Sequence, residues 1–98
     1  MTVQAFESLA DSLLETLEEG LDDAELQGGV LTIEGEEGTW VVNKHAPTRQ
    51  IWLSSPKSGA RHYAFDQGSG LWNDTRGGED LLTTLSHELG VSLAWSPT

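Results

Sequence analysis

Cysteine is absent from this 98-residue sequence, and basic residues are few. The lack of cysteine excludes disulfides, thiolate metal sites and cysteine nucleophiles. Five basic residues stand against 16 acidic ones, which gives a formal net charge of -11 at pH 7. This charge opposes binding to nucleic acid or to an anionic membrane, because both present negatively charged phosphates. It favours cations and basic protein surfaces as ligands.

Long apolar runs are missing as well, since none approaches the ~20 residues that a membrane-spanning helix needs. The first residues, Met1 to Glu7, lack the basic start and the apolar stretch of a secretory signal. They are not rich in arginine either, unlike a transit peptide. We therefore expect a cytoplasmic bacterial protein, or the processed form of an organellar one.

Motifs of the common enzyme classes are also missing. The sequence has no nucleophile elbow, no phosphate-binding loop and no HExxH motif. His45, His62 and His87 do not stand at metal-ligand spacing, so each is interpreted as an isolated surface or capping residue. Exposed carboxylates lack the desolvation that tunes a catalytic acid or base. Catalysis by this chain alone is therefore not expected.

The hydrophobic pattern predicts a helix, a series of short strands and a second helix. Apolar residues recur every three or four positions from Thr2 to about Leu21, as in an amphipathic helix. Residues 22–29 are interpreted as an acidic connector. Short alternating segments then predict five strands, at 30–34, 39–43, 50–54, 61–65 and 71–73. Their short connections indicate an antiparallel sheet of about five to six strands.

A second apolar stripe, Leu81, Leu82, Leu85 and Leu89, predicts a C-terminal helix that stops at Gly90. A chain of this length with 37% hydrophobic residues supports one domain, covering residues 1–98. Two helices can cover only one face of the sheet. The predicted fold is therefore an α+β two-layer sandwich whose other sheet face, the open face, meets solvent.

One face of the first predicted helix carries only acidic side chains. We call this group the acidic row: Glu7, Asp11, Glu15, Glu18 and Asp22 on one stripe, with Glu19 and Asp23 beside it. No lysine or arginine precedes Lys44 to offset these charges. Carboxylate oxygens suit hard cations such as Mg²⁺, Ca²⁺, Mn²⁺ and iron. The row alone is compatible with a weak cation site, a docking surface for a basic protein, or a solvated face.

The strand at 50–54 places a tryptophan opposite two aliphatic residues. Ile51 and Leu53 share one side, and Gln50 and Trp52 share the other. If the aliphatic pair faces the helices, Trp52 stands on the open face and can anchor a partner. The reversed phase is the alternative. Asn43 ends the preceding strand and falls nearby, whereas two other tryptophans, Trp40 and Trp72, are predicted in the core.

Several stretches resemble the frataxin family, whose bacterial members are called CyaY. The similarity runs through residues 29–33, 38–44, 50–56 and 58–59, and includes Tyr63, Trp72, the acidic end of the first helix and residues 87–89. It implies an αβ-sandwich that serves iron–sulfur cluster assembly as an iron chaperone or regulator. It also implies two partners, the cysteine desulfurase and the scaffold protein.

The resemblance also implies where iron and partners bind. The predicted ligands for weakly bound Fe²⁺ or Fe³⁺ are the seven carboxylates of the acidic row, of which Glu15, Glu18, Glu19, Asp22 and Asp23 match the family's acidic surface. The predicted partner-binding residues are Asn43, Gln50 and Trp52, which match the scaffold-binding sheet surface, and Arg61. His62 stands where eukaryotic members carry a basic residue, with Arg61 one position earlier.

Two alternative functions remain open at this point. One is a metal-independent acidic module that regulates a basic partner, and the other is a weak ferroxidase or iron-storage protein. We expect a monomer, with iron-dependent oligomerisation as the alternative, and no nucleic-acid or membrane partner. The compartment implied by the resemblance is the bacterial cytoplasm, or the mitochondrial matrix for a processed eukaryotic form.

Overall fold

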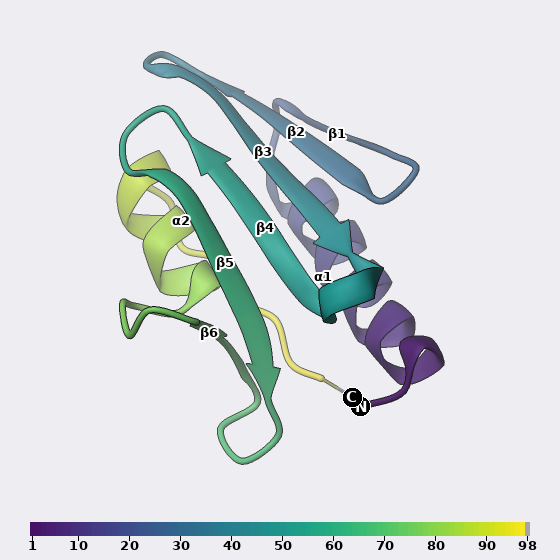
Figure 1. Ribbon diagram of the computed structural model, residues 1–98. Helices are drawn as coiled ribbons and strands as arrows, with labels where there is room; N and C mark the ends of the chain where they lie inside the picture. The colour runs from purple at the N-terminus through teal and green to yellow at the C-terminus, as the bar shows by residue number, and fades with distance from the viewer. Residues whose placement is uncertain (98) are drawn as a thin grey trace.

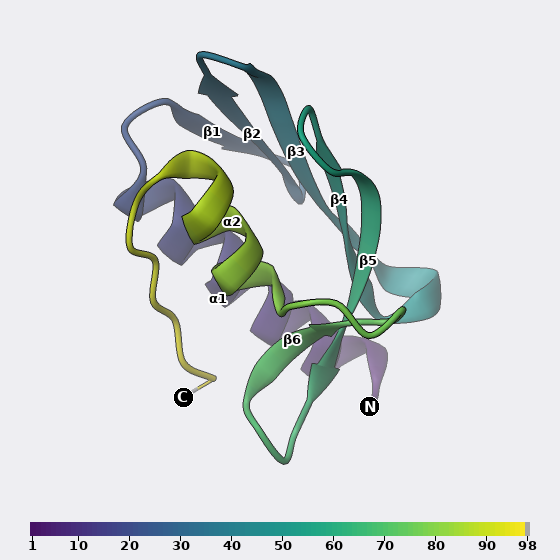
Figure 2. The same cartoon turned by 90° about the vertical axis from the view of Figure 1, so that its left-hand side faces the viewer.

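The computed structural model describes residues 1–97, which form two layers, a sheet and a pair of helices (Figure 1). The elements are α1 (Val3–Gly20), β1 (Ala24–Gln27), β2 (Val30–Gly35), β3 (Gly38–His45), the 3₁₀ turn η1 (Ala46–Thr48), β4 (Gln50–Ser55), β5 (Gly59–Asp66), β6 (Leu71–Asp74) and α2 (Leu81–Leu89). The six strands lie in chain order, and all neighbours are antiparallel. Both helices cover the same face of the sheet (Figure 2). The predicted α+β sandwich is confirmed.

The acidic connector predicted over residues 22–29 is wrong in part. Residues Ala24–Gln27 form β1, an edge strand that pairs with β2. Gly28 and Gly29 make the turn between the two strands with φ of 56° and 81°, values that glycine adopts at little cost. Four residues give too short an alternation to separate a strand from a polar loop by pattern alone.

The helix α1 forms because its cap and its apolar period agree. Thr2 caps the N-terminus, since its side chain accepts a hydrogen bond of 3.0 Å from the backbone N–H of Ala5. The buried stripe of the helix comprises Phe6, Ala10, Leu13, Leu14 and Leu17. This stripe packs over β1, β2 and β3. The opposite face of α1 is left to the acidic row.

A single hydrophobic core lies between the helices and the sheet. Both tryptophans predicted in the core are buried there, with Trp40 2% and Trp72 1% exposed. The edge of the Phe6 ring meets the Trp72 ring, with centroids 6.1 Å apart, which joins the start of α1 to β6. The core thus fixes which side of every strand faces away from the helices.

The second helix and the tail after it complete the helical layer (Figure 2). Asp80 caps α2 and Gly90 ends it in the left-handed conformation, as predicted for that glycine. Trp95 in the tail donates an indole hydrogen bond of 3.1 Å to Ser12 of α1. Among residues 1–97, neither helix is long and apolar enough to span a membrane.

Candidate functional site

The seven carboxylates of the acidic row lie along α1 and just beyond its end, but they are not equivalent. Four of them are exposed, and within residues 1–97 their side chains make no hydrogen bond or ion pair: Glu15, Glu19, Asp22 and Asp23. We call these four the free carboxylates. They follow one another along the C-terminal half of α1 and into the start of the link to β1. Their oxygen atoms are available to a cation.

The two carboxylates near the start of α1 are already paired with a lysine of β3, whose single positive charge they share. Lys44 Nζ lies 2.7 Å from Asp11 Oδ1 and 3.3 Å from Glu7 Oε2. The hydrogen bond with Asp11 is the largest effect on the Lys44 pKa, and it raises this pKa. Burial lowers the pKa and Glu7 raises it further, so the pKa of Lys44 lies above its ordinary value. Sequence reasoning missed this contact. The sequence feature that could have predicted it is the alternation of the strand, which puts Lys44 on the same side as Trp40 and Val42 and therefore on the side of α1.

Glu18 is engaged in a different way. Its Oε2 accepts a hydrogen bond of 2.9 Å from the backbone N–H of Leu26 in β1. That N–H faces away from β2, so without the carboxylate it would be an unpaired group on the sheet edge. Glu18 therefore helps to hold the edge strand against α1, and its position in the acidic row is partly structural.

No preformed metal cage exists in the part of the chain that the structure describes. Within residues 1–97, no three histidine, aspartate or glutamate side chains converge as a group that could hold a metal ion. The free carboxylates instead form an open series of oxygen ligands. Such a series fits a hard cation that keeps several of its waters, and it would bind weakly and exchange quickly.

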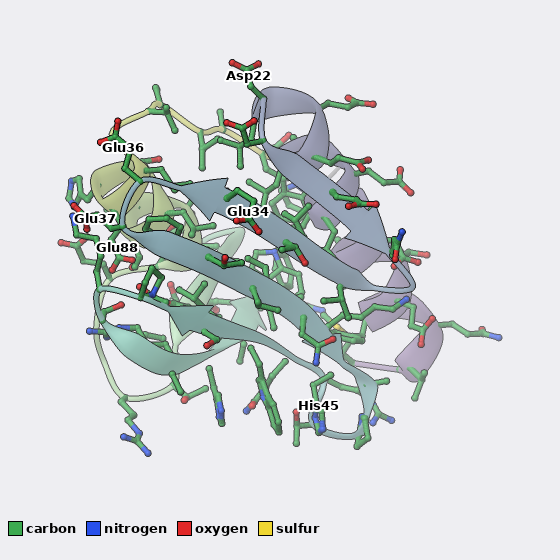
Figure 3. All side chains as sticks on the ribbon, turned by 90° about the horizontal axis from the view of Figure 1, so that it is seen from above. Asp22, Glu34, Glu36, Glu37, His45 and Glu88 are labelled. Carbon is green, nitrogen blue, oxygen red and sulfur yellow. The ribbon has the colours of Figure 1, made fainter. Side chains whose placement is uncertain are left out.

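Further acidic residues extend this surface beyond the row (Figure 3). A cleft of about 490 Å³ opens between the end of α1, the β2–β3 turn and the end of α2. Its acidic lining comprises Asp22, Asp23, Glu34, Glu36, Glu37 and Glu88. The sequence analysis assigned no function to the β2–β3 turn. The sequence feature that could have indicated its part in the acidic surface is the pair Glu36 and Glu37 between the two predicted strands.

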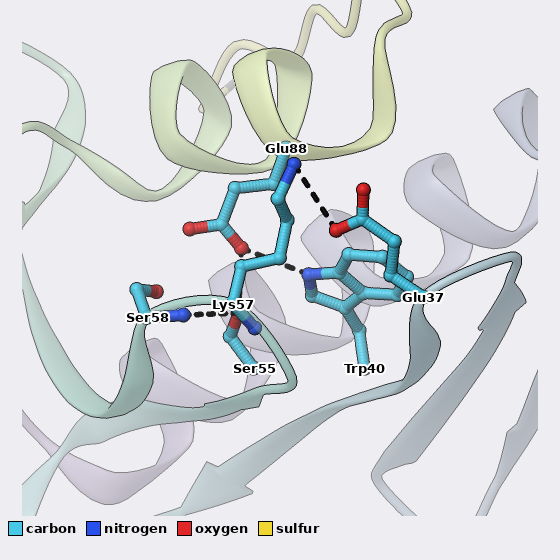
Figure 4. A network of polar contacts seen from close by, with 6 residues as sticks. All are labelled: Glu37, Trp40, Ser55, Lys57, Ser58 and Glu88. Atoms are coloured by element: carbon cyan, nitrogen blue, oxygen red, sulfur yellow. Dashed lines mark hydrogen bonds and ion pairs between the residues drawn. The ribbon is translucent and has the colours of Figure 1, made fainter.

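Glu88 belongs to a polar network that ties α2 to the sheet (Figure 4). Its Oε1 accepts hydrogen bonds from Trp40 Nε1 at 2.9 Å and from Ser55 Oγ at 2.6 Å. Burial, the largest effect, would raise the Glu88 pKa, but the hydrogen bonds from Ser55 and Trp40 together hold this pKa below its ordinary value. Beside it, Lys57 pairs with Glu37 at 3.2 Å. Glu88 is therefore a fixed structural anion.

Trp52 lies on the open face, as the first of the two predicted phases requires. Its partly exposed indole is stacked between the rings of His45 and His62, at centroid distances of 3.7 Å and 4.4 Å and interplanar angles of 12° and 9°. The indole Nε1 donates a hydrogen bond of 2.9 Å to Gln50 Oε1. Asn43 is paired with Trp52 in the sheet register. Figure 3 shows His45 on the side away from the helices.

His45 and His62 are surface residues, as predicted, but they are not isolated, because the antiparallel register brings both to Trp52. Arg61 does not join this surface. It pairs with Leu53 in the register and therefore points to the helix-covered side, where Nη1 lies 2.9 Å from Asp74 Oδ2. The structure thus brings together Asn43, Gln50, Trp52 and the two histidines, and it places Arg61 on the opposite face.

Comparison with known proteins agrees with this architecture. The family model for the frataxin-like domain matches residues 1–94. The chain belongs to the frataxin family. The bacterial iron-sulfur cluster assembly protein CyaY of Pseudomonas aeruginosa is 36% identical to this family member over 88 residues, which are 83% of this chain and 81% of the relative.

Two mitochondrial proteins are also related to this frataxin-family chain. The frataxin homolog of Schizosaccharomyces pombe is 46% identical over 84 residues, covering 82% of this chain and 53% of the relative. The frataxin-like protein of Leishmania donovani is 39% identical over 99 residues, covering 86% of this chain and 52% of the relative. The chain therefore spans about half the length of these two relatives.

Solved frataxin structures share the fold. Frataxin from Psychromonas ingrahamii superposes with a TM-score of 0.77 at 29% identity, covering 100% of this chain and 99% of that one. Trimeric frataxin from Saccharomyces cerevisiae, complexed with ferrous iron, superposes with a TM-score of 0.70 at 36% identity. That comparison covers 88% of this chain and 82% of the yeast chain. Iron binding therefore occurs within the family.

Proposed function

We propose that this chain is an iron-binding accessory protein of iron–sulfur cluster assembly. Its membership of the frataxin family and its similarity to a bacterial iron-sulfur cluster assembly protein support the pathway. The ferrous complex of the yeast relative supports iron as the metal. The observation that carries the proposal is the set of four free carboxylates at the end of α1, in a chain of net charge -11.

Iron acts here as cargo and not as a resident cofactor. An exposed series of carboxylates attracts Fe²⁺ or Fe³⁺ through charge and provides hard oxygen ligands. Because no convergent group of three ligands exists within residues 1–97, the ion keeps waters and leaves readily. This weak, exchangeable binding suits a carrier that passes iron to a partner.

Two surfaces would serve the partners, the cysteine desulfurase and the scaffold protein. The acidic row complements a basic protein surface and would raise the rate of encounter with it. On the open face, Trp52 offers an amphipathic ring of the kind that dominates many interfaces. We assign the scaffold contact to Trp52 with Asn43 and Gln50. Arg61 contributes at most indirectly, because it lies on the opposite face of the sheet.

The site assignment can be tested by titrating Fe²⁺ anaerobically into ¹⁵N-labelled protein and following each backbone amide by NMR. Paramagnetic broadening should affect residues 15–23 first, because the free carboxylates lie there. Broadening centred on His45 and His62 would contradict the assignment. A variant carrying Glu15→Gln, Glu19→Gln, Asp22→Asn and Asp23→Asn, here called the neutralised variant, should lose the effect.

A second candidate function is a metal-independent acidic module that docks on a basic partner. The absence of a convergent metal-ligand group within residues 1–97 favours it. The neutralised variant separates the two functions. If this variant loses desulfurase binding while its iron binding is unchanged, the hypothesis of a metal-independent module is correct and that of an iron carrier is wrong.

The oligomeric state and the compartment complete the proposal. The relatives comprise a bacterial CyaY and mitochondrial frataxins, which supports the bacterial cytoplasm or the mitochondrial matrix. We expect a monomer without iron. The trimeric yeast relative supports oligomer formation, and we keep iron-dependent assembly as the alternative. Size-exclusion chromatography with and without Fe²⁺ distinguishes a constant monomer from assembly that requires the metal.

A further inference from the structure

Lys44 is a cation that the fold itself supplies to the acidic row. It lies near the end of β3, and its side chain reaches across to α1, where Nζ is 2.7 Å from Asp11 and 3.3 Å from Glu7. Glu7 and Asp11 are one helical turn apart, so a single ammonium group can bridge them. Among residues 1–97, no other basic side chain forms an ion pair with α1.

The turn between β1 and β2 fixes the course of the lysine side chain. Gly29 has φ of 81°, and a Cβ atom at this position would lie 2.8 Å from Lys44 Cε and 3.1 Å from Cγ. The backbone N–H of Lys44 also donates a hydrogen bond of 3.0 Å to the carbonyl oxygen of Gly29. The glycine therefore leaves space in which the aliphatic part of Lys44 packs. This packing directs the ammonium group to α1.

Such an ammonium group differs from a mobile surface charge. The Lys44 side chain is only 20% exposed, whereas its partners Glu7 and Asp11 are 42% and 47% exposed. A metal ion that approaches these two carboxylates meets a positive charge that the backbone holds in place. Because the lysine is tethered, its effective concentration at the carboxylates is far above that of a free ion.

The C-terminal half of the acidic row has no basic partner equivalent to Lys44 within residues 1–97. Glu15, Glu19, Asp22 and Asp23 make no ion pair or side-chain hydrogen bond within residues 1–97. The helix α1 thus carries two electrostatically distinct halves, although its sequence shows a continuous series of acids. The difference comes from a strand residue far along the chain.

We infer that Lys44 sets the limit of the metal-binding surface, because it occupies Glu7 and Asp11 and confines hard cations to the C-terminal half of the acidic row. This inference rests on the proposed function, since it specifies where on α1 a metal is held. It makes Lys44 a specificity-determining residue that never contacts the metal. It also removes Glu7 and Asp11 from the predicted ligands.

The test uses Mn²⁺ as the probe and the variant Lys44→Met, whose side chain can still pack beside Gly29 but carries no charge. Amide broadening is measured by NMR at equal Mn²⁺ concentrations. In the wild-type protein it should be strongest over residues 15–23 and weaken along α1 toward Asp11 and Glu7. In the variant the broadening at Glu7 and Asp11 should rise above its wild-type level. Lys57→Met is the matched control, because it removes the same charge from the exposed pair with Glu37. This control should leave the broadening at Glu7 and Asp11 at its wild-type level.

Two results would overturn the inference. The first is a folded Lys44→Met protein whose Glu7 and Asp11 amides stay as sharp as in the wild type. The second comes from the double variant Glu7→Gln/Asp11→Asn, which changes only partly exposed side chains and is informative even if Lys44→Met does not fold. It should keep the wild-type broadening over residues 15–23, and a loss there would show that both residues are ligands.

Failure of the proposed function itself looks different. In that case the wild-type protein shows no broadening over residues 15–23 with Mn²⁺ or Fe²⁺. Any increase in Mn²⁺ broadening at the Glu7 and Asp11 amides of Lys44→Met would still be measurable in the same spectra, so the role of Lys44 is decided separately.

Discussion

At the scale of single residues, the role of a carboxylate in this protein depends on what its oxygen atoms already accept. Glu88 accepts two hydrogen bonds inside the structure, Glu18 accepts one from the sheet edge, and Asp11 accepts one from Lys44. Glu15 and Asp22 accept none within residues 1–97. Only groups of the last kind keep all their oxygen lone pairs for a metal ion.

Glu88→Gln should destabilise the protein in a pH-dependent way. Hydrogen bonds to a charged acceptor contribute about 1.5–3 kcal/mol, so we expect a loss of roughly 2 kcal/mol at pH 7. Since the Glu88 pKa is lowered in the folded state, its contribution is full above the unfolded-state pKa of about 4.3 and is lost as the pH falls through the folded-state pKa. Urea unfolding at pH 7 and at about pH 3.5 measures the difference between wild type and variant.

That difference should shrink at the lower pH. A Glu88→Gln protein that is equally destabilised at both pH values would show that the charge of the carboxylate does not matter. The exposed substitution Glu79→Gln is a suitable control, because within residues 1–97 the Glu79 side chain pairs only with the exposed His87.

Trp52→Ala should separate folding from partner binding. Two stacked aromatic contacts are lost, each of about 0.5–1.5 kcal/mol, which is less than the total stability of a typical domain. The far-UV spectrum should therefore stay native. Scaffold binding should weaken by roughly 30-fold, as for a hot-spot residue that contributes about 2 kcal/mol. Isothermal titration calorimetry and circular dichroism provide the two measurements, and unfolding of the variant would show that Trp52 serves the core.

Single-residue roles were only partly predictable from the sequence. The alternation Ile51–Trp52–Leu53 left two phases open, and the structure has the one in which Ile51 and Leu53 are buried and Trp52 lies on the open face. The contacts of Trp52 with His45 and His62 depend on the register between three strands, which no local pattern specifies. The same holds for Lys44, whose partners lie on α1.

At the scale of elements, α1 and β1 illustrate the limits of periodicity. The five buried positions of α1 repeat over 18 residues and identify the helix clearly. The strand β1 has four residues and one hydrogen-bonded neighbour, so its sequence resembles a polar link. Its stability comes from β2 on one side and from Glu18 of α1 on the other.

Glu18→Ala should loosen the edge strand without changing the rest of the fold. The amide of Leu26 loses its acceptor, so its hydrogen exchange should accelerate by about tenfold, the equivalent of ~1.4 kcal/mol in local opening. Glu15→Ala removes an equal charge from the same helix but no such hydrogen bond, and should leave the Leu26 rate unchanged. Equal rates in both variants would contradict the role assigned to Glu18.

At the scale of the whole molecule, charge dominates. Sixteen acidic residues in 98 produce a strongly negative surface, and the acidic row, the β2–β3 turn and the end of α2 gather part of it around one cleft. The sign and the size of the charge could be read from composition alone. The gathering of Asp22 with Glu36 and Glu37 required the fold, because these residues come from separate elements.

Added salt or divalent cations should therefore stabilise the folded protein. Screening of like charges recovers a few tenths of a kcal/mol for each crowded pair, so about 1 kcal/mol in total would raise the melting temperature by roughly 4 °C. Differential scanning calorimetry at low and high NaCl, and with Mg²⁺, measures this shift. A melting temperature that does not change with salt would mean that the acidic surface is not under repulsion.

We propose that the acidic surface of the protein acts with iron while its open face binds the scaffold. This division of roles is tested most directly by pull-down of the cysteine desulfurase and the scaffold protein, with and without Fe²⁺, using wild type, the neutralised variant and Trp52→Ala. The neutralised variant should lose the desulfurase and any effect of iron, and Trp52→Ala should lose only the scaffold. Equal capture of both partners by all three proteins, regardless of iron, would contradict the account.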